Sequence, residues 1–160
     1  MKKSTIAVIA VIAALTVGVA VLAVLNNKNA APGGQAQAAF WIKADGAARP
    51  VTMEDIEALG PREIQANYKK SGKNPEKRVY TGVPFAQVLA SKGIDCAGAK
   101  TAVFSASDGY SSILSIGEAL DGKNCYIVLD DGEDGPFRMI LPNARFSQNW
   151  CKLLTEVTIK

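Results

Sequence analysis

The sequence predicts an α+β domain that follows an apolar segment and a linker. Three observations lead to this prediction. The chain has 160 residues, which is room for one domain. Residues 4–25 carry no charged side chain, and the stretch up to residue 39 lacks the composition of a core. Residues 40–160 then alternate β-prone and amphipathic segments, which predicts about seven short strands and roughly two or three short helices.

The apolar segment has the length of a membrane-spanning helix. Its 22 residues follow Lys2 and Lys3. At a rise of ~1.5 Å per residue they span about 33 Å, close to the thickness of a bilayer's hydrocarbon core. Because the lysines precede the segment, we expect the N-terminus in the cytoplasm. The domain is then expected outside the cell membrane, in the periplasm or at the cell surface.

A cleaved signal peptide is the alternative, since Ala36-Gln37-Ala38 resembles a cleavage site. No cysteine lies directly after the apolar segment, so a lipoprotein is not expected. Residues 26–39 are rich in Asn, Gly, Gln and Ala and are expected to form a flexible linker. In either case the domain is predicted to be extracytoplasmic.

Composition excludes several classes of function. The chain has 18 basic and 15 acidic residues, and without Lys2 and Lys3 the balance is 16 minus 15, or +1. Nucleic acid is therefore not an expected partner, because it requires a basic surface. The absence of histidine removes Ser-His-Asp and Cys-His nucleophiles and His-based zinc sites. Three widely spaced cysteines cannot form a CxxC redox pair or a four-cysteine zinc site.

The first part of the domain carries the clearest local signals. Thr52 and Asp55 have the spacing of a capping box, and Met53, Ile56 and Leu59 form the apolar face of the short helix that follows. The other elements predicted here are a strand over Phe40–Lys43 that ends at Asp45-Gly46, a strand over Arg62–Tyr68, a charged hairpin turn over Lys69–Arg78, a returning strand over Val79–Gly82 and a helix from Pro84 to about Lys92.

The second part of the domain is predicted to be mainly β. Asp108-Gly109 is a hairpin turn signal between two β-prone segments. In chain order, the predicted elements are strands over Thr101–Ala106 and Tyr110–Leu114, a helical turn over Ile116–Leu120, a buried strand over Cys125–Leu129, an acidic loop over Asp130–Gly135, a strand over Phe137–Leu141 and a last strand over Leu153–Ile159.

Four motifs in order resemble the molybdopterin-binding domain of the sulfite oxidase family. They are Tyr80-Thr-Gly-Val-Pro-Phe85, Ser107-Asp-Gly-Tyr110, Gly135-Pro-Phe-Arg-Met-Ile-Leu-Pro142 and Asn149-Trp-Cys-Lys152. The resemblance extends from roughly Val51 to the C-terminus. It implies a mixed, barrel-like β fold with a few short helices and a cleft for a pterin, and it assigns residues 40–160 to that domain.

The sequence departs from the family at two places. Family members that hold molybdenum place a cysteine ligand shortly before the Thr-Gly motif, and residues 62–79 contain no cysteine. The family's Lys-Trp pair contacts the cofactor phosphate, and here Asn149 precedes Trp150. The resemblance therefore implies a pterin or molybdopterin ligand without a bound metal, and no catalytic residue is predicted.

A pterin site requires aromatic walls, a carboxylate for the amidine edge of the ring and donors for its carbonyl. Each candidate also has a structural alternative: Asp108 as a simple turn residue, the aromatic residues as core, and the arginines as solvated surface. The predicted ligand-binding residues are Asp108, Tyr110, Arg138, Arg145, Trp150 and Tyr80.

The cysteines Cys96, Cys125 and Cys151 are read either as inert buried thiols or as the source of one disulfide, since the predicted compartment is oxidising.

The leading function is a membrane-anchored, extracytoplasmic pterin-binding module that senses or delivers its ligand. Its partners would be the pterin, the membrane through residues 4–25, and a membrane or extracytoplasmic protein. The alternatives are an active molybdopterin-dependent oxidoreductase and an interaction domain that has lost the cleft.

Overall fold

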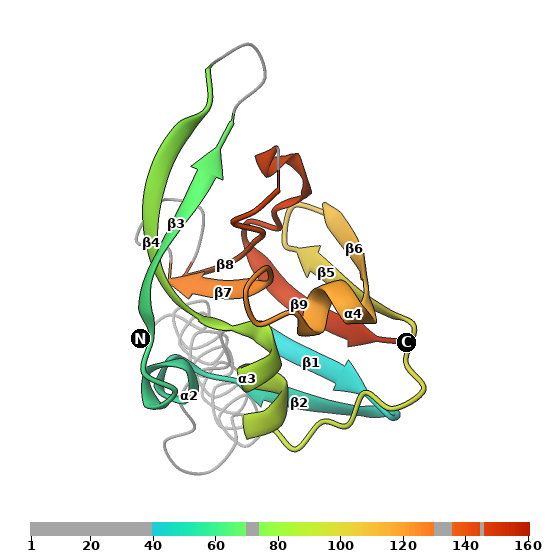
Figure 1. Cartoon of the computed structure of the whole chain (residues 1–160). Coiled ribbons are helices and arrows are strands. Elements are labelled where there is room, and N and C mark those ends of the chain that lie inside the picture. The colour runs from blue at the N-terminus through green and yellow to red at the C-terminus, as the bar shows by residue number, and fades with distance from the viewer. Residues whose placement is uncertain (1–39, 70–73, 130–135, 145) are drawn as a thin grey trace, which may run out of the picture. The chain divides into compact units, whose positions relative to one another are not determined.

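The computed structural model describes residues 40–69, 74–129, 136–144 and 146–160, and their strands form two β-sheets (Figure 1). The five-stranded sheet has the order β2-β1-β9-β5-β6. Strands β1 and β9 are parallel, and the other neighbours are antiparallel. Its strands are β1 Phe40–Ala44, β2 Ala47–Val51, β5 Thr101–Ala106, β6 Ser111–Ser115 and β9 Leu154–Ile159.

The four-stranded sheet is antiparallel throughout, with the order β3-β4-β7-β8. Its strands are β3 Arg62–Tyr68, β4 Glu76–Pro84, β7 Tyr126–Leu129 and β8 Phe137–Ile140. One isolated bridge joins Met139 of β8 to Cys151. This bridge places the end of β8 beside the segment that leads into β9, and the candidate site forms there.

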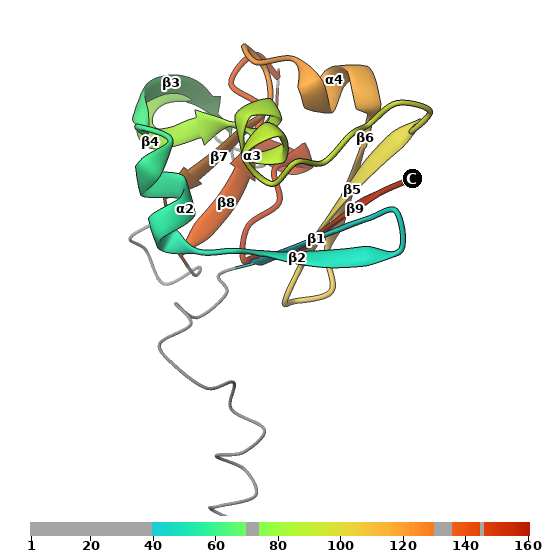
Figure 2. The same ribbon diagram turned by 90° about the horizontal axis from the view of Figure 1, so that it is seen from below.

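The core lies between the inner faces of the two sheets. Phe40 of β1 contacts Phe137 of β8, with ring centroids 5.6 Å apart. Helix α3, Phe85–Ser91, lies between the sheets in both views (Figures 1 and 2). Its Phe85 packs edge-on against Phe104 of β5 at 4.9 Å. These aromatic side chains belong to a larger buried apolar cluster, whose removal from water holds the sheets together.

The short helices are held by their caps. Helix α2, Met53–Ala58, begins with the predicted capping box: the Thr52 hydroxyl accepts from the Asp55 N–H at 3.2 Å, and the Asp55 carboxylate accepts from the Thr52 N–H at 2.8 Å. The same carboxylate binds the ammonium of Lys92, at the end of α3, at 2.6 Å. Helix α4, Ile116–Leu120, has an equivalent box between Ser115 and Glu118.

Gly82 of β4 allows the centre of the four-stranded sheet to close. A Cβ atom at this position would lie 2.3 Å from the Ile127 carbonyl oxygen and 2.6 Å from the Val128 Cα, both backbone atoms of β7. Ordinary carbon contacts begin near about 3.5 Å. The glycine of the Thr-Gly-Val-Pro motif is therefore required by packing and not by backbone conformation.

Several predictions need correction. The barrel-like arrangement is instead two sheets with separate end strands. Strand β2 was not predicted, because Ala-Ala-Arg-Pro-Val has weak strand propensity and forms a strand only by pairing with β1. Met53 was predicted on the buried face of its helix and is 37% exposed, so Ile56 alone is buried there.

The thiols of Cys96, Cys125 and Cys151 are free, so the disulfide considered above is not formed in this structure. In the described part of the chain, no helix is long and apolar enough to cross a bilayer. The predicted membrane segment at residues 4–25, the linker at 26–39 and the acidic loop at 130–135 lie outside the described residues.

Candidate functional site

A hollow with a volume of about 240 Å³ lies where the turn after β5 meets the segment before β9. We call it the Tyr110 pocket. Its lining residues come from two stretches of the chain that are about 40 residues apart in sequence. They are Asp108, Tyr110, Ser147, Gln148, Trp150 and Lys152.

The turn between β5 and β6 forms one side of the pocket. Asp108 Oδ1 accepts a hydrogen bond from the Tyr110 N–H at 2.9 Å, and Gly109 adopts a φ of 87° that favours glycine. The Tyr110 hydroxyl donates to the Gln148 carbonyl oxygen at 2.6 Å. The Ser112 hydroxyl donates to the Asn149 carbonyl oxygen at 2.8 Å. Side chains at the start of β6 thus hold the backbone of the opposite wall.

That opposite wall is the 3₁₀ turn η1, Ser147–Asn149, and the four-stranded sheet holds its other end. The Ser147 hydroxyl donates to the Lys69 carbonyl oxygen at 2.8 Å and accepts from the Lys69 N–H at 3.2 Å. The Lys69 ammonium lies 4.8 Å from the centroid of the Phe146 ring. Since Lys69 follows β3, η1 connects the two sheets at the mouth of the pocket.

Trp150 forms the inner wall and belongs mostly to the core. It is 3% exposed, and its indole N–H donates to the Leu141 carbonyl oxygen at 3.3 Å. Its ring contacts the Tyr80 ring at 5.6 Å and the Tyr68 ring at 5.9 Å between centroids. The pocket therefore reaches only the edge of an indole that is fixed by packing.

Two predicted residues lie behind this wall and do not line the pocket. Tyr80 is half-buried against Trp150, and Arg138 is 5% exposed, with its guanidinium carbon 5.9 Å from the Tyr80 ring centroid. Burial raises the pKa of Tyr80, although the charges of Arg138 and Arg78 act in the opposite direction. Arg138 is not on a solvated face, because every residue of β8 is buried. Arg145 lies outside the described residues.

The pocket combines one carboxylate with one ammonium. Asp108 and Lys152 both line it. Tyr110 lines it too, and burial raises the pKa of its phenol. Cys151 is buried beside the pocket, and burial and the charge of Asp108 raise the pKa of its thiol to about 12. This thiol is consequently protonated at neutral pH and is not a reactive nucleophile.

Of the predicted site residues, Asp108, Tyr110 and Trp150 come together in one pocket. Sequence reasoning missed Ser147 and Gln148, which carry no pattern of their own. Lys152 belongs to the fourth family-like motif, and this position was the available signal that it lies near the site. The turn η1 contributes to the pocket through backbone carbonyl oxygens. Every residue has this group, so residue types do not indicate which carbonyls take part.

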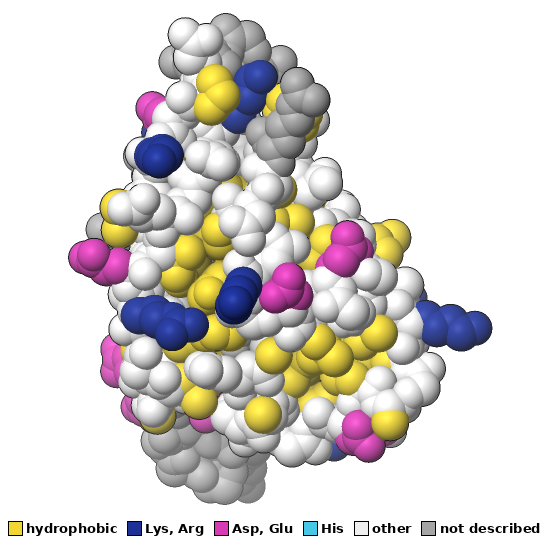
Figure 3. All heavy atoms as spheres, in the orientation of Figure 1, with side chains coloured by type: hydrophobic (Ala, Val, Ile, Leu, Met, Phe, Trp, Pro, Cys, Tyr) yellow, Lys and Arg dark blue, Asp and Glu magenta, His cyan; other side chains and the backbone are white. Residues whose placement is uncertain are grey.

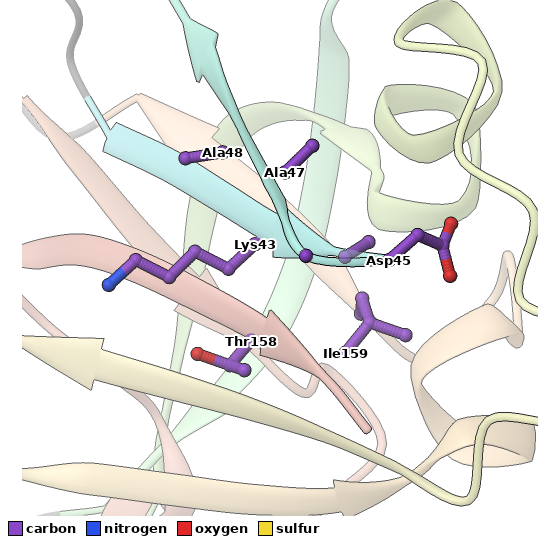
Figure 4. Close-up of a pocket in the computed structure, with 8 residues that line it drawn as sticks. Lys43, Asp45, Ala47, Ala48, Thr158 and Ile159 are labelled. Carbon is purple, nitrogen blue, oxygen red and sulfur yellow. The ribbon is translucent and has the colours of Figure 1, made fainter.

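A second hollow of about 300 Å³ lies at the turn between β1 and β2, next to the end of β9. Figure 4 shows that the Lys43 and Asp45 side chains point in opposite directions from it. The Lys43 ammonium is paired with Glu156 at 2.6 Å. Because its polar groups do not converge, this hollow is the weaker candidate for a ligand site.

Charge is distributed evenly over the face of the molecule drawn in Figure 3. Basic and acidic side chains lie singly among neutral and apolar ones. This arrangement agrees with the near balance of charge that the sequence has after residue 25.

Comparison with known proteins bears on the fold. No family model matches the chain, and no curated protein matches its sequence. Among solved structures, the chain is similar to the sulfane dehydrogenase SoxCD from Paracoccus pantotrophus, with a TM-score of 0.62 and 15% sequence identity. The match covers 81% of this chain and 39% of the other, so this chain spans about two-fifths of that neighbour's length. The similarity supports the sulfite oxidase-like fold that the four motifs predict.

Proposed function

We propose that the domain binds a pterin in the Tyr110 pocket and acts as an extracytoplasmic, membrane-anchored module that senses or delivers it. The observation that carries the proposal is the convergence of Asp108, Tyr110 and Trp150 in one pocket of a sulfite oxidase-like fold. That fold occurs in a family of molybdopterin enzymes, and the pocket offers both aromatic surface and a carboxylate.

The residues of the Tyr110 pocket fit a pterin ring better than they fit a molybdenum ion. A volume of about 240 Å³ is smaller than the roughly 300–1,000 Å³ of most ligand clefts, which suits a bicyclic ring. A bound pterin would supply a flat heteroaromatic ring with an amidine edge and a carbonyl. Asp108 would accept from the amidine edge through the oxygen that Tyr110 does not use, and Lys152 would donate to the carbonyl or to an anionic substituent. None of the six residues that line the pocket is a cysteine, and Cys151 beside it is 0% exposed, so the pocket presents no thiolate for molybdenum.

The decisive experiment is a titration of the full chain with oxidised and reduced pterins, in which binding is monitored by the fluorescence of the pterin. Asp108→Asn should weaken binding by about 1.5–3 kcal/mol, or roughly 10- to 150-fold, because it removes the charge of the proposed partner. Asparagine retains the oxygen that accepts from the Tyr110 N–H, so the turn should persist.

Asp95→Asn is the matched control. Asp95 is also exposed and makes the same kind of turn, with Oδ1 accepting from the Ala97 N–H at 2.9 Å, but it does not line the Tyr110 pocket. It should bind pterin as the parent does. Equal affinity of parent and Asp108→Asn would move the site elsewhere, and no binding by the parent at millimolar pterin would refute the function itself.

A further inference from the structure

The two sheets have four end strands, and three of these are protected against pairing with another chain. Strand β2 contains Arg49 and Pro50, and proline cannot donate a ladder hydrogen bond. Strand β3 begins with the exposed charges of Arg62 and Glu63. Proline and charge are the usual means by which sheet edges avoid association.

The third protected edge is β8, which is covered by its own chain. The Met139 N–H donates to the Cys151 carbonyl oxygen at 2.8 Å, and the Cys151 N–H donates to the Met139 carbonyl oxygen at 3.1 Å. Within the described residues, the fourth end strand, β6, has no partner on its outer side. Figure 1 shows β6 at the margin of the molecule, outside β5.

Strand β6 lacks the protection of the other edges. Its sequence, Ser-Ser-Ile-Leu-Ser, has no charge and no proline. Its Ile113 is 67% exposed, more than any other large apolar side chain in the described part of the chain. Ile113 lies opposite Val103 of β5 in the sheet register. Together they form an apolar row that extends to the edge.

The outward backbone groups of β6 follow from its bonds to β5. The Ala106 N–H donates to the Tyr110 carbonyl oxygen at 2.9 Å, and the Ile116 N–H donates to the Lys100 carbonyl oxygen at 2.9 Å. Because backbone direction alternates along a strand, the residues between these two that have odd numbers direct their N–H and C=O groups away from β5. They are Ser111, Ile113 and Ser115.

We infer that β6 pairs antiparallel with β6 of a second copy of this chain, about a two-fold axis at Ile113. Ile113 then lies opposite the partner's Ile113, and Ser111 lies opposite the partner's Ser115. The Ser115 N–H already donates to the Glu118 carboxylate at 3.0 Å, so about four hydrogen bonds form between the strands instead of six.

The strand suits its own copy for two reasons. About a two-fold axis at Ile113 the exposed row of the strand pairs with itself, Ile113 with Ile113 and Ser111 with Ser115, so that apolar meets apolar and hydroxyl meets hydroxyl. No charge is brought against a like charge within the paired strands. The area involved is small compared with the roughly 1,200–2,000 Å² of stable complexes, so the pairing is weak and is best detected by trapping.

Cysteine cross-linking of the full chain in detergent tests the pairing. The variants are made with Cys96→Ser, since Cys125 and Cys151 are buried. In a hydrogen-bonded antiparallel pair the Cα atoms lie about 5.5 Å apart, within the roughly 4.4–6.8 Å range of disulfides. Under mild oxidation, Ile113→Cys should therefore form a covalent dimer.

Val79→Cys is the control, because Val79 is 58% exposed but lies in β4, which is not an end strand of its sheet and pairs with β3 at this position. Ile113→Cys should cross-link about tenfold or more faster than this control, as expected when pairing raises the effective concentration of the two thiols. Equal rates would mean random collision and would overturn the inference, as would the absence of any dimer of Ile113→Cys.

The register has its own test. Ser111→Cys should not cross-link to itself, because the two sulfur-bearing residues would be four positions apart, or about 14 Å. A mixture of Ser111→Cys and Ser115→Cys should cross-link. Dimers of Ser111→Cys alone, or a mixture that fails to react, would overturn the two-fold pairing. The thermal unfolding of each variant is measured under reducing conditions. Unchanged unfolding temperatures would establish that the cross-linking rates compare folded proteins.

Discussion

Replacing Gly82 with alanine should destabilise the domain strongly, although it adds only one methyl group. The added Cβ would lie 2.3 Å from the Ile127 carbonyl oxygen and 2.7 Å from Val128 Cγ1. Relief to an ordinary contact near about 3.5 Å needs a displacement of roughly 1 Å between β4 and β7. Ile127 and Val128 are both 0% exposed, so the shift must pass into the core. We expect a loss of about 3 kcal/mol, at the upper end of typical overpacking costs.

The assay is equilibrium unfolding in urea, with Gly117→Ala as the control. Gly117 lies in α4, where a Cβ would meet no atom within 4 Å. The same chemical change should there stabilise the protein by about 0.5–1 kcal/mol, since alanine is the better helix former. Opposite signs at the two glycines are expected. A Gly82→Ala variant within about 0.5 kcal/mol of the parent would refute the close approach of β4 to β7.

Two further predictions concern ionisation. The Asp55 carboxylate is partly buried, which raises its pKa, but its hydrogen bonds from Lys92 and Thr52 outweigh burial and lower its pKa below 3.8. The contribution of this carboxylate to the stability of the folded state is therefore present above pH 3.8 and is lost as the pH falls through the lowered pKa. Asp55→Asn should therefore cost about 1 kcal/mol in urea unfolding at pH 7 and progressively less as the pH falls below 3.8; a cost that does not change with pH would contradict this. Burial raises the pKa of all three thiols, but Cys125 and Cys151 are fully buried whereas Cys96 is partly exposed, so iodoacetamide should modify Cys96 alone in the folded protein and all three thiols after unfolding. Rapid native labelling of Cys151 would show that the wall beside the pocket opens.

Local signals in the sequence predicted the elements whose stability depends on near neighbours in the chain. The capping box of Thr52 and Asp55 formed as predicted, because its donors and acceptors are three residues apart. The alternation over Arg62–Tyr68 gave a strand with those bounds, and Asp108-Gly109 forms the turn between β5 and β6. The ordered motifs also indicated the sulfite oxidase-like fold that the structural comparison supports.

Tertiary contacts decided the features that depend on distant segments. Pairing with β1 makes a strand of the weakly β-prone residues of β2. Arg138 was expected on one face of an alternating strand, but β8 is covered on both faces, which the strand's own sequence does not reveal.

The Tyr110 pocket shows the same division. Asp108 and Tyr110 were identifiable from a turn motif. Their position opposite η1 depends on hydrogen bonds from Tyr110 and Ser112 to backbone carbonyls that are 38 and 37 residues away in sequence, respectively. Local residue patterns therefore indicate which side chains are available for a site. Only the packing of two sheets decided which of them meet, because that outcome depends on strand register and backbone position and not on local residue type.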